Sequence, residues 1–234
     1  MAESSVKRRP KSALLVHGAG GGGWEWKVWR GVFDAAGIKA YAPDLQPSAQ
    51  GLAETTLDEY AAQVGATLRD LPRPRALIGA SIGGLLAAMC AGDADQLILI
   101  NPIPPSPWHA QLPQREWPDI VPWQREARLT ATRRALPDSD DATALFAFRH
   151  WRDDSGAVMR AAQAGVAVEK PPCPVLCIAS RVDDDVPPAL TQALALEWGA
   201  SLLRVPAISH VGPLLGRGAA AVALQAVSWL SSGR

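Results

Sequence analysis

Residues 75–91 read RALIGASIGGLLAAMCA, and this stretch decides the fold class. An apolar run that is typical of a strand leads into Gly79-Ala80-Ser81-Ile82-Gly83, and an apolar helical run follows directly. A serine on such a sharp turn is held in a strained conformation that projects its hydroxyl above the sheet, and small flanking residues avoid collisions. The positive end of the next helix points at the same place. The stretch therefore predicts a nucleophilic serine where a strand meets a helix.

The rest of the chain alternates in the same way between apolar runs and helical stretches. Because strand and helix follow one another repeatedly, we predict an α/β fold with a mostly parallel central sheet. Continuous apolar strands suit a sheet that carries helices on both faces. The predicted strands cover residues 13–16, 38–42, 75–78, 97–100, 174–179 and 201–205. The predicted helices pass through Trp29 and Phe33 and cover residues 57–68 and 83–91.

The alternation breaks between residues 101 and 170. This segment begins with a proline-rich stretch, NPIPPSPWHAQLPQREWPDIVPW, and continues with two or three helical runs across residues 124–168. Prolines stiffen a connection that needs no strand pairing. We therefore expect a core built from residues 1–100 and 171–234, with residues 101–170 inserted as a small helical lid. A merely packed helical subdomain is the alternative.

Composition narrows the class of protein and its partners. Of the 234 residues 48% are hydrophobic, and 23 Lys and Arg balance 23 Asp and Glu, which is typical of a globular protein. A net charge of zero provides no field that would gather phosphates or anionic lipid, so we expect neither a nucleic-acid partner nor a membrane surface. The basic run at residues 7–11 is interpreted as a solvated tail. Residues 13–16 are too short for the core of a signal peptide, and the expected compartment is cytoplasmic.

Cysteine usage points to neither a disulfide framework nor a metal centre. The chain has 3 cysteines, an odd number, and Cys173 and Cys177 lack a companion pair of histidines. We therefore predict no metal.

A serine hydroxyl is a weak nucleophile, so it needs a histidine that takes its proton and a carboxylate that orients the histidine. His210 follows the predicted strand at 201–205, and Asp183 follows the predicted strand at 174–179. The order Ser81, Asp183, His210 is the one expected for this architecture. Asp184 and Asp185, the neighbours of Asp183, are interpreted as solvated turn residues.

Acyl transfer also needs backbone N–H donors where the carbonyl oxygen becomes negative. The predicted donors are the amide of Ile82, which follows the serine, and that of Ala19 in the HGAGGGG segment. His17 of that segment is interpreted as a side chain that positions the loop.

These motifs resemble the α/β-hydrolase superfamily, and the resemblance extends over almost the whole chain. LLVHGAGGGGWEWKVW (residues 14–29) is similar to the loop and helix of small esterases related to plant methylesterases and hydroxynitrile lyases. YAPDL, LIGASIGG, LILINP, PVLCIASRVDDDVPP and ISHVG follow in the family's order. The resemblance implies a triad of Ser81, Asp183 and His210, oxyanion amides at Ala19 and Ile82, a cap inserted after residue 100, and no cofactor.

The residues thus predict a serine hydrolase that cleaves an ester or thioester of a small to medium hydrophobic molecule. Four tryptophans are predicted to line the substrate pocket: Trp24, Trp108, Trp123 and Trp151. An acyltransferase, a C–C hydrolase or a lyase could use the same triad. A hydroxynitrile lyase would require a lid lysine, and the only candidate, Lys170, lies at the edge of the insertion.

Two more distant alternatives remain at this point. Residues 18–23 match the G-x-G-x-x-G pattern of dinucleotide-binding oxidoreductases, and Asp44 follows about 20 residues later. Four consecutive glycines satisfy that pattern almost automatically, however. A non-catalytic scaffold on a hydrolase fold is the second alternative, because fold alone does not determine function.

Overall fold

Six parallel strands form the central sheet of the computed structural model, which describes residues 9–232. Their order across the sheet is β2-β1-β3-β4-β7-β8, and every neighbouring pair is parallel. The strands are β1 (Ser12–Val16), β2 (Lys39–Tyr41), β3 (Arg75–Ala80), β4 (Gln96–Ile100), β7 (Val175–Ser180) and β8 (Ser201–Val205). The predicted strands and the mostly parallel sheet are confirmed. Residues 7 and 8 of the basic run lie outside the described residues.

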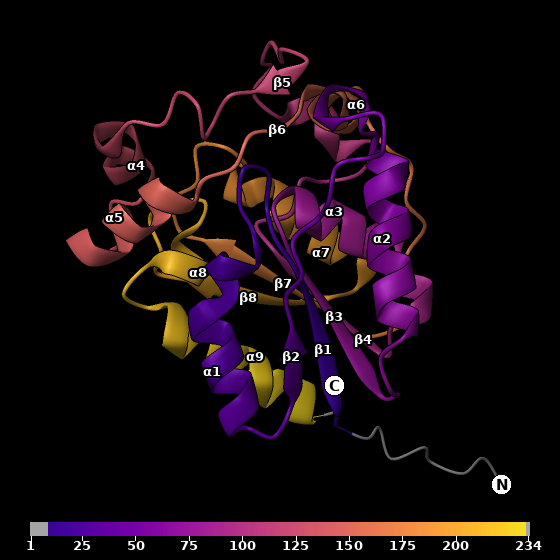
Figure 1. The fold of residues 1–234 in the computed structure, drawn as a ribbon. Coiled ribbons are helices and arrows are strands. Elements are labelled where there is room, and N and C mark those ends of the chain that lie inside the picture. Colours follow the sequence, from indigo (N-terminus) through magenta and orange to yellow (C-terminus); the bar gives the residue numbers. More distant parts are fainter. Residues whose placement is uncertain (1–8, 233–234) are drawn as a thin grey trace, which may run out of the picture.

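Helices cover both faces of this sheet (Figure 1). The long helices of the core are α1 (Lys27–Ala35), α2 (Leu57–Arg69), α3 (Ile82–Met89), α7 (Pro188–Trp198) and α9 (Ala219–Ser232), and α8 (Gly212–Leu215) is short. Short 3-10 helices are η1 (Gly23–Trp26), η2 (Leu52–Glu54), η3 (Ala91–Asp93) and η4 (Trp108–Gln111). The three predicted helices correspond to α1, α2 and α3, and their presence is confirmed.

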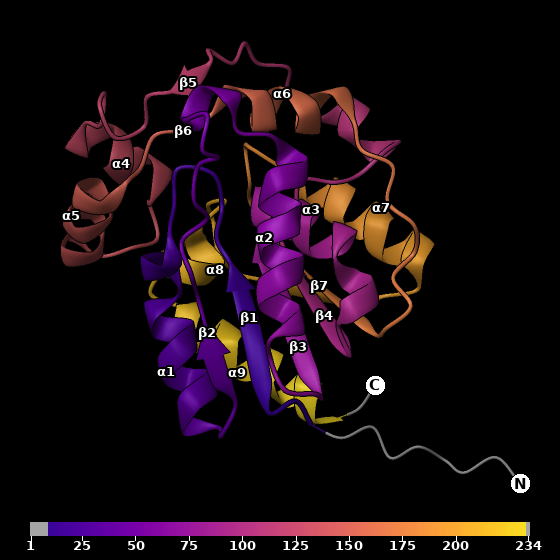
Figure 2. The same cartoon turned by 45° about the vertical axis from the view of Figure 1, so that its right-hand side comes forward.

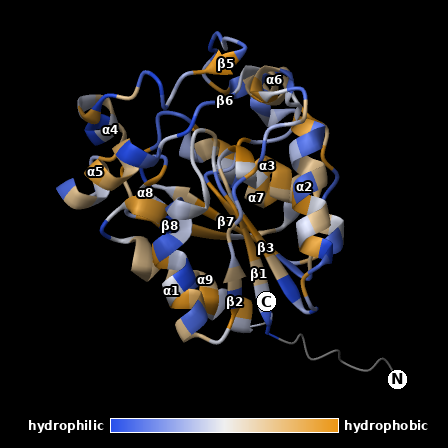
Figure 3. Cartoon of the chain, in the orientation of Figure 1, coloured by the Kyte–Doolittle hydropathy of each residue, from blue (hydrophilic) through white to orange (hydrophobic). Residues whose placement is uncertain are grey.

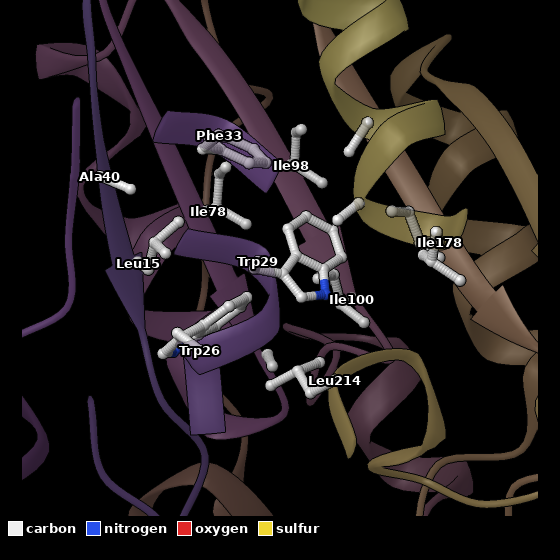
Figure 4. Close-up of a cluster of buried hydrophobic side chains, with 14 of the residues drawn as sticks. Leu15, Trp26, Trp29, Phe33, Ala40, Ile78, Ile98, Ile100, Ile178 and Leu214 are labelled. Atoms are coloured by element: carbon white, nitrogen blue, oxygen red, sulfur yellow. The ribbon is translucent and has the colours of Figure 1, made fainter. Parts of the chain in front are cut away.

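Successive side chains of the central strands enter two separate hydrophobic clusters, because side chains alternate across a sheet. On the face covered by α1, α8 and α9, Leu15, Ile78 and Ile98 pack against Trp29 (Figure 4). The indole N–H of Trp29 donates to the carbonyl oxygen of Pro213 at 2.9 Å, so this buried polar atom is satisfied. The strands are correspondingly the most hydrophobic part of the chain in Figure 3.

The opposite face packs against α2, α3 and α7. Its cluster contains Leu14, Leu77 and Leu97 from the strands and Leu68 from α2. Helix α2 begins with a capping box, in which the hydroxyl of Thr56 accepts the amide of Glu59 while the Glu59 carboxylate accepts the amide of Thr56. The four central strands β1, β3, β4 and β7 are therefore buried along their whole length, as continuous apolar strands require.

Residues 101–170, called the insertion below, separate β4 from β7. They contain α4 (Leu129–Ala135), α5 (Asp141–His150) and α6 (Gly156–Ala164), and a two-stranded antiparallel sheet of β5 (Ile120–Val121) and β6 (Asp154–Ser155). Figure 2 shows these elements above the carboxyl ends of the strands. The short sheet had no counterpart in the sequence prediction.

The chain changes direction across the sheet at β1. It runs outward from β1 to β2 and then returns to place β3 on the other side of β1. Loops that follow β1 and β3 therefore diverge at a switch point, which is where open α/β sheets bind ligands. Within residues 9–232, none of the helices is both long and apolar enough to span a bilayer.

Candidate active site

Ser81 occupies the turn between β3 and α3 in a strained conformation. Its φ of 56° and ψ of −124° lie outside the regions that L-residues favour, which costs about 1–3 kcal/mol. The surrounding hydrogen bonds hold the turn in place: the Ser81 amide donates to the carbonyl oxygen of Ile100 at 3.0 Å, and the Ser81 carbonyl oxygen accepts the amide of Ile103 at 2.9 Å. The strained turn inferred from the sequence is therefore present.

The two glycines of the turn are required because backbone atoms of neighbouring segments lie very close to them. A Cβ added to Gly79 would lie 2.0 Å from the carbonyl oxygen of Gly83, and a Cβ on Gly83 would lie 2.4 Å from the carbonyl oxygens of Val16 and His17. Strand, turn and helix can pack this tightly only when both positions lack side chains.

Asp183 and His210 form a hydrogen-bonded pair at the ends of β7 and β8. Nδ1 of His210 lies 2.7 Å from Oδ2 of Asp183. The other carboxylate oxygen of Asp183 accepts the amides of Asp185 and Val186, both at 2.9 Å. The side chain of Asp183 is fully buried and that of His210 is 13% exposed. The carboxylate thus has a fixed orientation, and it holds the imidazole with Nδ1 protonated.

The charges around His210 favour its protonated form. Burial on its own would lower the pKa of the imidazole, but the hydrogen bond and charge of Asp183, together with the charges of Asp185 and Glu25, raise the pKa above its ordinary 6.5. Asp183, Asp185 and His210 also place three potential metal-ligating atoms within 4.8 Å of one another. Both oxygens of Asp183 already accept hydrogen bonds from protein groups, so the pair is better explained as an orienting contact.

The glycine-rich loop, residues 17–23, brings the amide of Ala19 to the same cavity as Ser81. The amide of Gly18 donates to Oε2 of Glu25 at 3.3 Å, that of Gly20 to Oδ2 of Asp154 at 2.9 Å, and that of Gly21 to the carbonyl oxygen of Gly18. Within residues 9–232 the amide of Ala19 donates to no protein acceptor, and neither does that of Ile82.

His17 fixes the start of this loop. Its buried ring donates from Nδ1 to the carbonyl oxygen of Gly18 at 2.8 Å and accepts the amide of Leu45 at Nε2 at 2.9 Å. Burial lowers the pKa of the imidazole, so His17 is neutral. Both contacts agree with its interpretation as a loop-positioning side chain.

A cavity of about 700 Å³ lies between the insertion and the carboxyl edge of the sheet. Ser81, His210, Gly18 and Ala19 line its floor on the core side. No hydrogen bond joins the side chains of Ser81 and His210 in the described part of the chain, although both border this one cavity. A contact between a catalytic base and its nucleophile commonly tightens only when substrate binds.

Two of the four predicted pocket tryptophans line this cavity, namely Trp123 and Trp151. Trp24 and Trp108 do not, and the prediction was wrong for them. The ring of Trp24 packs edge-on against Trp151, with centroids 5.3 Å apart, and is not part of the cavity lining. Trp108 packs against the hydrophobic cluster of α2, α3 and α7. Trp117, which was not predicted, is part of the cavity wall.

Glu25 is the principal residue that sequence reasoning missed. It is only 2% exposed, it borders the cavity, and its carboxylate occupies the space that a side chain on Gly21 would need. Burial raises the pKa of Glu25 to about 8, although the amides of Gly18 and Gly22 and the charge of His210 oppose this shift. An acidic residue between two tryptophans, followed by a helix, was the available signal.

Asn101 is a second missed residue. It has a φ of 41° and is 2% exposed. Its side-chain amide donates to the carbonyl oxygen of His210 at 2.6 Å and to the hydroxyl of Ser180 at 2.8 Å, and its side-chain oxygen accepts the amide of Ser180. Asn101 therefore links the ends of β4 and β7 to the loop that carries His210.

Packing explains the glycines of residues 18–23, whose spacing matched the pattern of a dinucleotide site. Oδ1 of Asp44 accepts the amide of Gly23 at 2.7 Å, so that carboxylate closes the loop. A Cβ on Gly23 would lie 2.0 Å from the carbonyl oxygen of Ala42, and one on Gly22 would lie 2.8 Å from the ring of Trp24. These glycines face protein atoms.

Comparisons with known proteins agree with this architecture. A family profile described as "Alpha/beta hydrolase family" matches residues 13–225. A methylesterase from Arabidopsis is similar in structure, with a TM-score of 0.70, 18% identity, and coverage of 93% of this chain and 99% of that chain. Tomato methylketone synthase I, solved with 2-tridecanone, has a TM-score of 0.75 at 15% identity, covering 96% and 99%.

A pyrethroid hydrolase from Sphingobium faniae has a TM-score of 0.69 at 19% identity, covering 95% of this chain and 97% of that chain. At these identities the likeness concerns the fold. Among curated proteins none matches the sequence significantly.

Proposed function

The chain belongs to the alpha/beta hydrolase family, and we propose that it is a serine hydrolase that cleaves a carboxylic ester or thioester through an acyl-enzyme. One observation carries the proposal. Ser81, His210 and Ala19 come from three separate loops and border one cavity. Asp183 bonds to His210 from behind, and the amide of Ile82 directly follows the strained Ser81. These are the nucleophile, base, orienting acid and oxyanion donors that acyl transfer requires.

In the proposed mechanism the oxygen of Ser81 attacks the substrate carbonyl carbon while Nε2 of His210 takes the hydroxyl proton. The amides of Ala19 and Ile82 stabilise the negative oxygen that develops. The imidazolium then returns the proton to the departing alcohol or thiol. A water molecule, deprotonated by His210, attacks the acyl carbon, and the acid leaves with Ser81 restored. Throughout, Asp183 keeps the imidazole oriented and stabilises its charged form.

The cavity supports a small to medium hydrophobic substrate. Its volume of about 700 Å³ is within the usual range for sites that enclose a drug-sized molecule. Trp117, Trp123, Trp151 and Met159 contribute apolar wall from the insertion. Two of the similar structures are, by their names, a methylesterase and a pyrethroid hydrolase, which favours an ester.

Replacing the nucleophile tests the proposal. Ser81→Ala should lower kcat for p-nitrophenyl butyrate by about 10⁵-fold or more, because no other group can form the acyl-enzyme. Its thermal melting should match that of the wild type, because the hydroxyl of Ser81 supports no contact of the fold. Ser232→Ala, at an exposed position on α9, serves as the matched control and should keep full activity. A Ser81→Ala enzyme with the wild-type rate would refute the assignment.

The substrate class can be narrowed with a panel. p-Nitrophenyl esters from acetate to octanoate, assayed beside methyl esters and thioesters, report which acyl length the tryptophan-lined cavity accepts. We expect kcat/KM to rise from acetate to a medium-chain ester, because each added methylene buries more apolar surface. A uniform response across the panel would contradict a hydrophobic acyl pocket.

A further inference from the structure

The insertion contacts two loops of the candidate site through buried or partly buried carboxylates. Asp154 in β6 reaches the glycine-rich loop (residues 17–23), and Asp138, between α4 and α5, reaches the histidine loop (residues 206–211). We propose that Asp138 and Asp154 are positioning residues, through which the insertion holds these two loops in the geometry that the chemistry needs. This inference rests on the proposed function.

The contact at Asp154 fixes the residue next to Ala19. Oδ2 of Asp154 accepts the amide of Gly20 at 2.9 Å, and the amide of Arg152 donates to the carbonyl oxygen of Gly20 at 2.8 Å. Both backbone polar groups of Gly20 are therefore bonded to the insertion. Gly20 also has a φ of 71°, and a Cβ there would lie 2.7 Å from the ring of Trp123. The insertion thus fixes the peptide between Ala19 and Gly20, which is next to the peptide that carries the Ala19 amide.

Asp154 is in turn fixed from the core. Its Oδ1 accepts the hydroxyl of Tyr60 in α2 at 3.1 Å and the amide of Ser155 at 2.8 Å, and the residue is 7% exposed. Burial, and secondarily the charge of Asp154, raise the pKa of the Tyr60 hydroxyl, which stays protonated and donates. A buried carboxylate that accepts three hydrogen bonds has little freedom to move.

Asp138 holds the histidine loop in a comparable way. Its Oδ1 accepts the hydroxyl of Ser209 at 2.7 Å and its Oδ2 accepts the amide of Ile208 at 3.0 Å. The carboxylate fits because position 212 is glycine, where a Cβ would lie 2.3 Å from Oδ2. Ile208 and Ser209 directly precede His210, so the Asp138 carboxylate limits where the imidazole can lie.

An ion pair between the insertion and the loop after β7 differs from these two contacts. Arg115 pairs with Asp185 at 2.6 Å, but both side chains are 46% exposed. Exposed ion pairs contribute little, because water screens them. The inference therefore concerns the two aspartates and leaves this pair aside.

Replacing Asp154 with asparagine breaks one contact selectively. The Asn oxygen can still accept from Tyr60 and Ser155, but its NH₂ group then faces the Gly20 amide, and two donors cannot bond. We expect kcat for p-nitrophenyl butyrate to fall about 10- to 100-fold with little change in KM, the cost of a small misplacement of the oxyanion donor. Asp153→Asn is the matched control, because Asp153 bonds only within the insertion, to Gln124 and Arg125.

Asp138 is tested by a pair of variants. Asp138→Ala removes both acceptors and should lower kcat about tenfold or more. Asp138→Asn keeps both contacts, since its oxygen accepts the Ile208 amide and its NH₂ donates to the rotatable hydroxyl of Ser209, so it should restore most of the rate. Asp140→Ala, which removes the cap of α5 at Thr143, is the matched control.

Amide hydrogen exchange decides whether the loss comes through the loops. Exchange in residues 18–23 should accelerate in Asp154→Asn, and exchange in residues 206–211 in Asp138→Ala, while both controls match the wild type. Unchanged exchange in these loops would overturn the inference, with or without a loss of rate, and so would equal losses of rate in the controls. A wild type that hydrolyses no ester would instead refute the proposed function, and the exchange comparison would still decide whether the aspartates position the loops.

Discussion

Glu25 is the residue whose environment is most unusual for its type. It is a buried carboxyl group with a pKa of about 8 that lies under the glycine-rich loop. Sequence reasoning missed it because a single acidic residue at the start of a helix is normally exposed, and its burial depends on how residues 17–23 fold back over it. Ser81 directly follows β3, and Asp183 and His210 lie in the loops that follow β7 and β8, so the sequence could identify all three as candidates.

Burial of Glu25 has a consequence for stability. Because its pKa is raised from 4.5 to about 8, the native state binds more protons than the unfolded state between these values, so this group makes stability fall as pH rises from 5 to 8. The slope from one group is at most about 1.4 kcal/mol per pH unit. Glu25→Gln keeps an acceptor for the Gly18 amide and removes the titration. Its melting temperature should therefore rise relative to that of the wild type as pH rises. Thermal melts at pH 5 to 8 check this, and parallel curves would contradict it.

His210 should set the acid limit of activity. The reaction needs a neutral imidazole, and the raised pKa means that kcat/KM should fall as pH drops through a midpoint above 6.5. Asp183→Asn removes the hydrogen bond and charge that raise this pKa. It should move the midpoint to lower pH and reduce kcat by about 10⁴-fold. A pH–rate profile of both enzymes gives the answer, and a flat wild-type profile from pH 5 to 8 would exclude His210 as the base.

At the scale of elements, the turn between β3 and α3 depends on the absence of side chains at its glycines. Gly79→Ala places a Cβ 2.0 Å from the carbonyl oxygen of Gly83, so the strand and helix must separate. We expect a loss of about 3 kcal/mol or more in the free energy of unfolding, measured by urea denaturation. Gly92→Ala is the matched control, because a Cβ there would meet no atom within 4 Å. Equal midpoints for the two variants would show that the turn tolerates a side chain.

The strands of the core could be predicted closely and the insertion could not. Strands such as β4 and β7 are buried on both faces of the sheet and are therefore continuous apolar runs. Such runs can be recognised in the sequence. β5 and β6 have 2 residues each, which is too short for any periodicity to show. Whether Trp24 or Trp117 faces the cavity depends on tertiary contacts, such as that of Trp24 with Trp151 and that of Trp117 with Trp123, which local sequence does not determine.

At the scale of the whole molecule, the site depends on three strand ends that meet at one place. Ser81 follows β3, Asp183 follows β7 and His210 follows β8 in the sequence. Because the strands are parallel, all three strand ends lie at one edge of the sheet. The insertion lies over that edge (Figure 1). Its residues also form part of the cavity lining. The topology thus explains how residues far apart in the sequence border one site.

Covalent labelling tests this convergence most directly. The folded protein is treated with a fluorophosphonate, and the modified residue is located by peptide mass spectrometry. The account predicts one phosphonyl group on the oxygen of Ser81, formed much more slowly in His210→Ala and absent in Ser81→Ala, because only a serine with an adjacent base attacks the reagent. A folded protein that stays unlabelled at Ser81, or that labels equally fast without His210, would contradict the account.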